Sequence, residues 1–249
     1  EYNMQNNTEN DILQLPEKIA IEKGIQIVIC IDEFQQISDF EDSKTFQKKL
    51  RSVWQLQQHV SYCLFGSKKH LMNELFEKKN LPFYKFGDAI YLAKIETKYW
   101  IEYICKRFEN TGKHISPELA EEICRLVDNH SSYVQQLSWL LWIRTINTAT
   151  TEQLSYALED LLDQNNILFQ SETENLSAYQ MNFLKAIVDG IHTKFSSKEV
   201  ISKYNLGTSA NIVRLKNALL QKELIETNGK EIVLADPVFG VWFKKEMLY

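Results

Sequence analysis

The sequence contains no apolar run long enough to cross a membrane, and Ile27 to Ile31, one of its longest, has the length of a buried strand. Its first ten residues are polar, so they do not match a secretory signal peptide, and the first of them is not methionine. We therefore expect a cytoplasmic protein that binds no membrane. We also expect the sequence to be a fragment of a longer chain.

Cysteine is scarce, and the spacing of the cysteines argues against a metal site or a disulfide. The four cysteines are Cys30, Cys63, Cys105 and Cys124, and no two of them form a C-x-x-C pair. Each lies inside an apolar stretch, so we predict buried free thiols in a reducing compartment. A metal site or a disulfide is not expected.

A strong excess of one charge is also lacking. The chain has 28 Lys and Arg against 33 Asp and Glu, and residues 176–249 have 10 against 7. That tail is mildly basic, far from the charge of a dedicated DNA binder. With 249 residues, 44% of them hydrophobic, the composition is that of a globular protein that can bury a core.

Strand and helix patterns alternate over residues 1–93. Three short apolar segments read as strands, and helical patterns lie between them; the segments are Ile25–Ile31, Val60–Phe65 and Ala89–Leu92. Before them, Pro16 suits the first turn of a short helix that Gly24 ends. This order predicts an α/β partial parallel sheet, about half of a complete one.

The strand pattern stops after Lys94, and two helical regions follow. Residues 94–174 show four amphipathic segments with caps or short turns, which predicts an all-α bundle. In residues 175–249 three helices precede a hairpin with Asn228-Gly229 at its tip. Three helices and a two-stranded wing predict a winged helix-turn-helix.

The clearest chemical signal is the pair Asp32-Glu33 at the end of the first strand. A carboxylate there faces the crevice in which open α/β sheets bind ligands, and Mg²⁺ prefers oxygen ligands. The next carboxylate is placed to orient and deprotonate an attacking water. An acidic turn without function fits these two residues about equally well.

Several segments in order carry a resemblance to a known family. They are Ile27–Gln35, Tyr62–Met72, Leu81–Asp88, Asn129–Leu137 and Asp236–Trp242. The first resembles a Walker B strand, the second a sensor 1 strand, the third a conserved turn, the fourth a lid motif and the fifth the end of a winged helix. Together they resemble the archaeal and bacterial ATPase family within the AAA+/STAND group of P-loop ATPases.

The resemblance implies a role for each matching residue, with ATP and Mg²⁺ as cofactors. Asp32 would hold Mg²⁺ through water, Glu33 would be the catalytic base, and Ser67 would sense the γ-phosphate. Lys68 and Tyr133 would contact the nucleotide.

Other positions match the family less well. His130 is an alternative to Tyr133 as the residue that touches the base, and the packed start of a helix is an alternative for both. Lys85 and Asp88 stand where the family often has Gly-Arg, so an arginine-finger role has no support here.

The phosphate-binding loop G-x-x-x-x-G-K-[S/T] is missing from this sequence. The Gly-Lys pairs are Gly112-Lys113 and Gly229-Lys230, and the upstream glycines they would need are replaced by Arg107 and Leu224. The resemblance implies that this loop lies upstream, with the first strands of the sheet. We then expect the two main strands to pair through a third element and to leave an apolar face or edge exposed.

Three functions remain open. The first is a C-terminal fragment of an ATPase that acts as a nucleotide-dependent switch. The intact parent would hydrolyse ATP, and it would assemble with further copies of itself or with another protein. The second, less favoured, is a DNA-binding regulator whose recognition helix is Ser209 to Lys222. The third is a scaffold that does not depend on nucleotide, in which Asp32-Glu33 is a relic.

Overall fold

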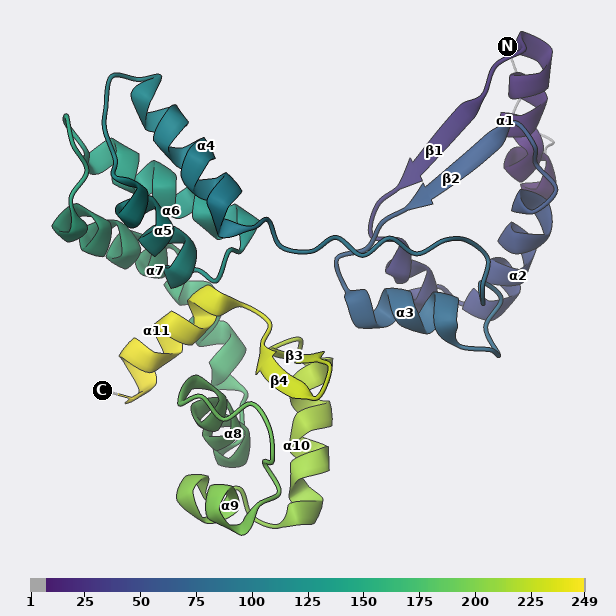
Figure 1. Ribbon diagram of the computed structural model, residues 1–249. Helices are drawn as coiled ribbons and strands as arrows, with labels where there is room; N and C mark the ends of the chain where they lie inside the picture. The colour runs from purple at the N-terminus through teal and green to yellow at the C-terminus, as the bar shows by residue number, and fades with distance from the viewer. Residues whose placement is uncertain (1–7, 249) are drawn as a thin grey trace. The chain divides into compact units, whose positions relative to one another are not determined.

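The computed structural model describes residues 8–248 in two compact units, one up to Tyr91 and one from Leu92 onward. Each unit has its own hydrophobic core, and Figure 1 shows the elements of both. Most of the polar start, residues 1–7, and Tyr249 lie outside the described residues. Among residues 8–248, no helix has the length and apolar character that a membrane crossing needs.

The first unit is built on a small parallel sheet. Its elements are α1 (Glu9–Lys23), β1 (Ile27–Ile31), the 3-10 helix η2 (Phe34–Asp39), α2 (Ser43–Trp54), β2 (Val60–Leu64) and α3 (Lys69–Glu77). The two strands pair in parallel, in a register that runs from Ile27↔Val60 to Ile31↔Leu64. Figure 1 shows them side by side, with α2 in the connection between them.

Residues 89–92 do not form the third strand that the sequence predicted for this sheet. Residues 88–96 are neither helix nor strand, and the side chains of Ile90 and Leu92 are 85% and 93% exposed. A strand forms where another backbone takes up its hydrogen bonds, and β-propensity alone does not supply that partner. The predicted strand Ala89–Leu92 is therefore wrong, and so is the prediction that β1 and β2 pair through a third element, because they pair directly.

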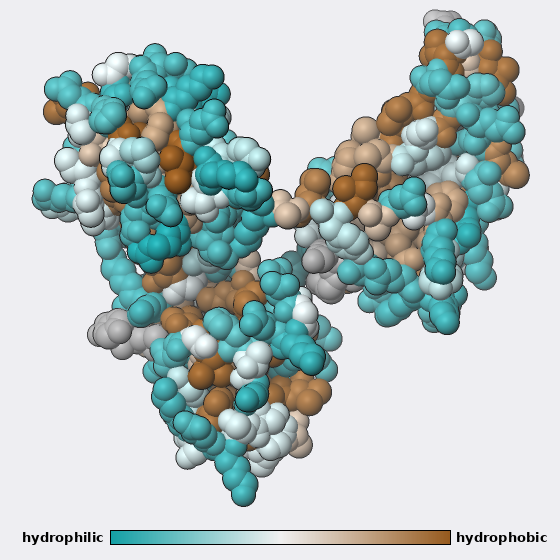
Figure 2. Space-filling model, viewed as in Figure 1, coloured by the Kyte–Doolittle hydropathy of each residue, from teal (hydrophilic) through white to brown (hydrophobic). Residues whose placement is uncertain are grey.

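The two faces of the sheet are in different surroundings. On one face Tyr62 stacks on Trp54 of α2, with ring centroids 4.1 Å apart. On the other face Val28 is 66% exposed, and its neighbours Cys30 and Cys63, which are partners in the strand register, are exposed too. Figure 2 shows brown and tan residues where Figure 1 places β1 and β2. The prediction of an exposed apolar face is confirmed.

The exposed face corrects the prediction for two of the four thiols. Cys30 and Cys63 are exposed, Cys105 is half-buried, and only Cys124 is fully buried as expected. Strand alternation is the reason, because every second residue of β1 and β2 points away from the helices that cover the other face. The apolar stretch around each cysteine gave no information about which face is covered.

Alkylation of the folded chain should therefore separate the cysteines. We expect Cys30 and Cys63 to react rapidly with iodoacetamide at mildly alkaline pH. Cys124 should react only after unfolding, because burial also raises the pKa of its thiol to about 11 and leaves little thiolate. Peptide mass spectrometry gives the three rates, and equal rates for the three thiols would contradict the observed faces of the sheet.

Helix α1 begins before the residue that the sequence suggested. Thr8 and Asp11 form a capping box, and the helix continues through Pro16 to a left-handed Gly24 with φ 63°. The end at Gly24 was predicted correctly, but the start in the first turn at Pro16 is wrong. A proline inside a helix costs about 3 kcal/mol, and a good cap recovers about 1 kcal/mol of it. Burial of Ala20 on the same helix contributes to its stability as well.

The second unit contains a helical bundle followed by a winged helix. The bundle comprises α4 (Thr97–Glu109), α5 (Pro117–Leu126), α6 (Ser131–Arg144) and α7 (Thr151–Glu174). The winged helix comprises α8 (Ala178–Val188), α9 (Lys198–Tyr204), α10 (Ser209–Gln221), β3 (Ile225–Asn228), β4 (Glu231–Leu234) and α11 (Pro237–Leu248). Ser116 caps α5 and Ser197 caps α9, since each side-chain oxygen accepts a hydrogen bond from a backbone N–H. Asn228 pairs with Glu231, so the loop of the hairpin is Gly229-Lys230, one residue beyond the predicted tip.

Candidate functional site

The carboxyl ends of β1 and β2 form the candidate site. Beyond the strands, the Phe65 amide donates to the Ile31 carbonyl at 2.9 Å, and the Phe34 amide donates to the Phe65 carbonyl at 2.8 Å. These two bonds extend the parallel ladder by one step past each strand. They place the turn that holds Asp32 and Glu33 next to the turn that holds Ser67.

Glu33 is the centre of the site. Its backbone has φ 50°, a left-handed conformation that is uncommon for a residue other than glycine, and its amide donates to Asp32 Oδ1 at 2.8 Å. Its Oε2 oxygen accepts a hydrogen bond from Ser67 Oγ at 3.1 Å and another from the Gln35 amide. Asp32 is exposed and Glu33 is half-buried. The structure thus brings together three of the predicted residues: Asp32, Glu33 and Ser67.

Gln35 and Gly66 also belong to this site, although the sequence analysis gave neither a role. Gln35 is only 2% exposed, and its Oε1 is buried without a hydrogen-bond partner. A Cβ added at Gly66 would lie 2.6 Å from the sulfur of Met72 and still closer to Gln35 Oε1. Only glycine therefore fits at the close approach between the two turns. Two signals in the sequence pointed to this pair: the Gln of the Walker B pattern and the Gly-Ser after the segment that resembles sensor 1.

The remaining predicted residues of the first unit are Lys68, Lys85 and Asp88. Lys68 occupies the N-cap position of α3, and its carbonyl accepts from the amides of Leu71 and Met72 at 3.0 Å each. Lys85 and Asp88 are exposed, and Lys85 has a left-handed backbone with φ 51°.

Arg51 of α2 holds the turn on which Lys85 lies. Its guanidinium donates to the carbonyls of Pro82 and Tyr84, the latter at 3.0 Å, and lies over the ring of Phe86. No sequence motif indicates this role.

Tyr133 and His130 lie in the second unit, at the start of α6. Tyr133 is 8% exposed, and its hydroxyl donates to Asp236 Oδ2 at 2.5 Å. The ring centroid of His130 is 4.8 Å from that of Tyr133. Both residues therefore have a clear packing role, and contact of Tyr133 with a nucleotide stays a prediction.

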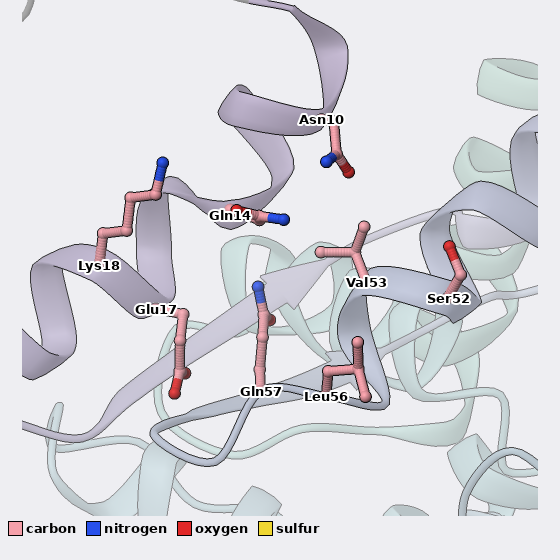
Figure 3. Close-up of a pocket in the computed structure, with 8 residues that line it drawn as sticks. All are labelled: Asn10, Gln14, Glu17, Lys18, Ser52, Val53, Leu56 and Gln57. Carbon is pink, nitrogen blue, oxygen red and sulfur yellow. The ribbon is translucent and has the colours of Figure 1, made fainter.

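A pocket in the first unit lies away from the carboxylates of Asp32 and Glu33. It has a volume of about 450 Å³ and opens between α1 and α2; its lining residues are Asn10, Gln14, Glu17, Lys18, Ser52, Val53, Leu56 and Gln57 (Figure 3). Leu56 and Gln57 precede β2, whereas Asp32 follows β1. Because the strands are parallel, the pocket is at the opposite end of the sheet from the candidate site.

No group of three or more His, Cys, Asp and Glu side chains suited to a metal ion occurs in the part of the chain that the structure describes.

Comparison with known proteins finds a matching family model and similar solved structures. Residues 167–245 match the model of a probable winged helix domain, a range that begins within α7. A Walker-type ATPase of Pyrococcus abyssi is similar in structure, with a TM-score of 0.73 at 16% identity; the match covers 96% of this chain and 69% of that one. The chain is therefore similar in fold to part of that ATPase, and residues 167–245 form a winged helix domain.

Weaker structural matches are to two further proteins. The ORC2 protein of Aeropyrum pernix, solved in ADPNP–ADP complexes, has a TM-score of 0.49 at 13% identity over 100% of this chain and 72% of that one. The RuvB Holliday junction branch migration motor of Thermotoga maritima has a TM-score of 0.45 at 13% identity, over 98% of this chain and 76% of that one. Comparison with curated protein sequences gave no match.

Proposed function

We propose that the chain is the C-terminal part of an ATP-binding switch protein of the AAA+/STAND kind. The observation that carries the proposal is the meeting of Asp32, Glu33 and Ser67 at the carboxyl ends of two paired parallel strands. Open α/β sheets bind ligands at this edge. The likeness in fold to the Walker-type ATPase, over 96% of the chain, supports it.

The residues at this edge fit a magnesium-bound triphosphate in part. Asp32 is exposed and offers a hard oxygen ligand, and Ser67 offers a hydroxyl that donates within the same cluster. When bound, Mg²⁺ and ATP would supply the phosphoryl group and neutralise its developing charge. The backbone cradle for the phosphates is missing from this sequence, so we assign it to another segment of the same protein.

Glu33 is the residue to which we assign the proton transfer. Its Oε2 already accepts bonds from Ser67 and Gln35, so we assign Oε1 to the attacking water. The two donors fix the orientation of the carboxylate before any ligand binds. Such a fixed orientation is what a general base requires, because proton transfer occurs only at hydrogen-bonding distance.

The exposed face of the sheet agrees with a further segment of the protein. Strands of parallel sheets are apolar on both faces because helices cover both, and here the face with Val28, Cys30 and Cys63 is exposed. We propose that a strand and helix bearing the phosphate loop cover this face, and that slow alkylation of Cys30 and Cys63 in a longer protein would report it. We also propose that such a protein assembles either with a second copy of itself or with another protein.

Binding of Mg-ATP to the 249-residue chain tests where the phosphate cradle lies. We expect only weak binding, in the millimolar range, and no turnover, because one carboxylate and one hydroxyl do not hold a triphosphate without backbone amides and a lysine. Isothermal titration calorimetry and a phosphate-release assay measure the two quantities. Micromolar binding to this chain alone would place the nucleotide site elsewhere.

DNA binding through the winged helix is the second candidate function. Arg214 and Asn217 of α10 are exposed, and so is Lys222, which follows the last residue of the helix. Only 10 basic against 7 acidic residues from 176 to 249 make this the weaker candidate. Duplex binding that weakens steeply with salt, and that Arg214→Ala reduces, would favour it.

A further inference from the structure

Two cysteines that are far apart in the sequence are neighbours on the sheet of the first unit. Cys30 lies in β1 and Cys63 in β2, and they are partners in the parallel register. Both are exposed, and so are Val28 and Ser61, the register partners two residues earlier on the same strands. Side chains two residues apart on a strand lie on one face of the sheet. The two thiols therefore lie side by side on the exposed face.

The spacing of the two strands suits a bond between these thiols. Neighbouring strands lie about 4.8 Å apart, so the Cα atoms of register partners are separated by about that distance. A disulfide joins Cα atoms about 4.4 to 6.8 Å apart whose Cβ atoms point the same way, and Cys30 and Cys63 meet both conditions. Strand spacing also holds the two Cβ atoms slightly beyond the about 3.5 to 4.5 Å of a relaxed disulfide. Such a bond is strained and exposed, so it is easily reduced again.

The other two cysteines offer no comparable pair. Cys105 of α4 is half-buried, and its thiol donates to the Ile115 carbonyl at 3.8 Å. Cys124 of α5 is fully buried, and burial raises the pKa of its thiol to about 11, so little of it is thiolate. Both belong to the second unit, so they serve as internal controls for a reagent that selects exposed, neighbouring thiols.

We propose that Cys30 and Cys63 form a dithiol site that peroxides oxidise reversibly to a disulfide. One thiolate attacks hydrogen peroxide, so that an S–O bond forms, the O–O bond breaks and hydroxide leaves. The second thiolate then attacks the resulting sulfenic acid, the S–S bond forms, the S–O bond breaks and a second hydroxide leaves. The two thiol protons convert both hydroxides to water, and the two thiols supply the two electrons that reduce the peroxide. A small thiol such as glutathione reverses the step by thiol–disulfide exchange.

This dithiol site does not depend on nucleotide binding, but it lies close to the candidate site. Cys30 comes two residues before Asp32, and Cys63 comes four residues before Ser67. The disulfide would therefore join the two strands directly before the turns that hold those residues. A segment that covers this face, as we propose for a longer protein, would shield both thiols. Oxidation would then occur only where the face is open.

Peroxide treatment of the reduced 249-residue chain tests the proposal. After free thiols are blocked and the chain is digested without reductant, mass spectrometry should find Cys30 linked to Cys63 within one molecule, with the loss of two hydrogen atoms. Dithiothreitol should restore both thiols. The link should form at least about tenfold faster in the folded chain than in urea, because the unfolded chain must first close a loop. Cys30→Ser and Cys63→Ser should each abolish it, whereas Cys105→Ser, the matched control, should leave its rate unchanged.

Phenylarsine oxide gives a second readout that requires no oxidation, because its arsenic bonds two neighbouring thiols. The folded wild type should bind one equivalent, which dithiothreitol removes and a monothiol does not. Cys30→Ser and Cys63→Ser should lose this adduct while their circular dichroism stays that of the wild type. Absence of the linked peptide from the oxidised folded chain, or equal rates of its formation with and without urea, would overturn the proposal. So would an arsenic adduct that persists in Cys30→Ser, since another pair of thiols would then be the site.

Discussion

In a protein that joins this chain to a phosphate loop, Glu33→Gln is expected to lower ATP hydrolysis by about 10² to 10⁴-fold. The change removes the proton acceptor and keeps the size of the side chain. An amide oxygen at the position of Oε2 still accepts the Ser67 hydroxyl. Nucleotide affinity should therefore stay within a few-fold of the wild type, because the lost group is a base rather than a ligand. Single-turnover hydrolysis and fluorescent-nucleotide titration measure the two effects separately.

Two further variants make the result specific to Glu33. Glu41→Gln changes an exposed acid a few residues along the chain and should leave both quantities unchanged. Asp32→Asn should instead weaken binding in the presence of Mg²⁺ and have less effect without it. If Glu33→Gln hydrolyses ATP at the wild-type rate, the assignment of the base is wrong.

The parts of the fold that local chemistry determines were predictable. A run of β-branched residues indicated β1, and the segment before Gly66 indicated β2. Ser116 and Ser197 marked two helix starts, because their hydroxyls satisfy backbone amides that a helix leaves free. Such signals act within a few residues of the chain, so they are visible in the sequence.

Features that depend on distant neighbours were not predictable in the same way. Residues 89–92 have the composition of a strand and lack a paired strand. Cys30 and Cys63 lie in apolar segments, yet whether their face is covered depends on helices elsewhere. Helix α1 passes through Pro16, and its cap at Thr8 offsets part of the cost of the proline.

The candidate site likewise contains residues that the sequence indicated and residues whose role only the structure shows. Asp32 and Glu33 stood out because two carboxylates directly after a buried strand are informative by themselves. Gln35, Gly66 and Arg51 act through contacts made across the fold, so their types and spacing carried little information. Tyr133 was noticed through a motif, and only the structure shows that its hydroxyl is bound to Asp236.

Gly66→Ala adds a single methyl group, yet it should lower the free energy of unfolding of the first unit. Gly66 has no positive φ, so an alanine there would by itself stabilise the chain by about 0.4 to 1 kcal/mol through the unfolded state. The new methyl group, however, would lie 2.6 Å from the Met72 sulfur and closer still to Gln35 Oε1. Overpacking of this kind costs about 1 to 3 kcal/mol. We expect a net loss of about 1 to 2 kcal/mol, measured by urea unfolding followed through NMR signals of amides in the first unit.

Gly87→Ala is the matched control for this prediction. Gly87 also lacks a positive φ, and a Cβ built there would meet nothing within 4 Å, so the substitution should be neutral or slightly stabilising. The two variants share the same change in chemistry and differ only in the space around the new methyl group. Because Gln35 donates to Glu33, the displaced amide in Gly66→Ala should also disturb the carboxylate. Equal stability of the two variants would mean that the turn after β2 is not packed against Gln35, and the geometry assigned to Glu33 would lose its support.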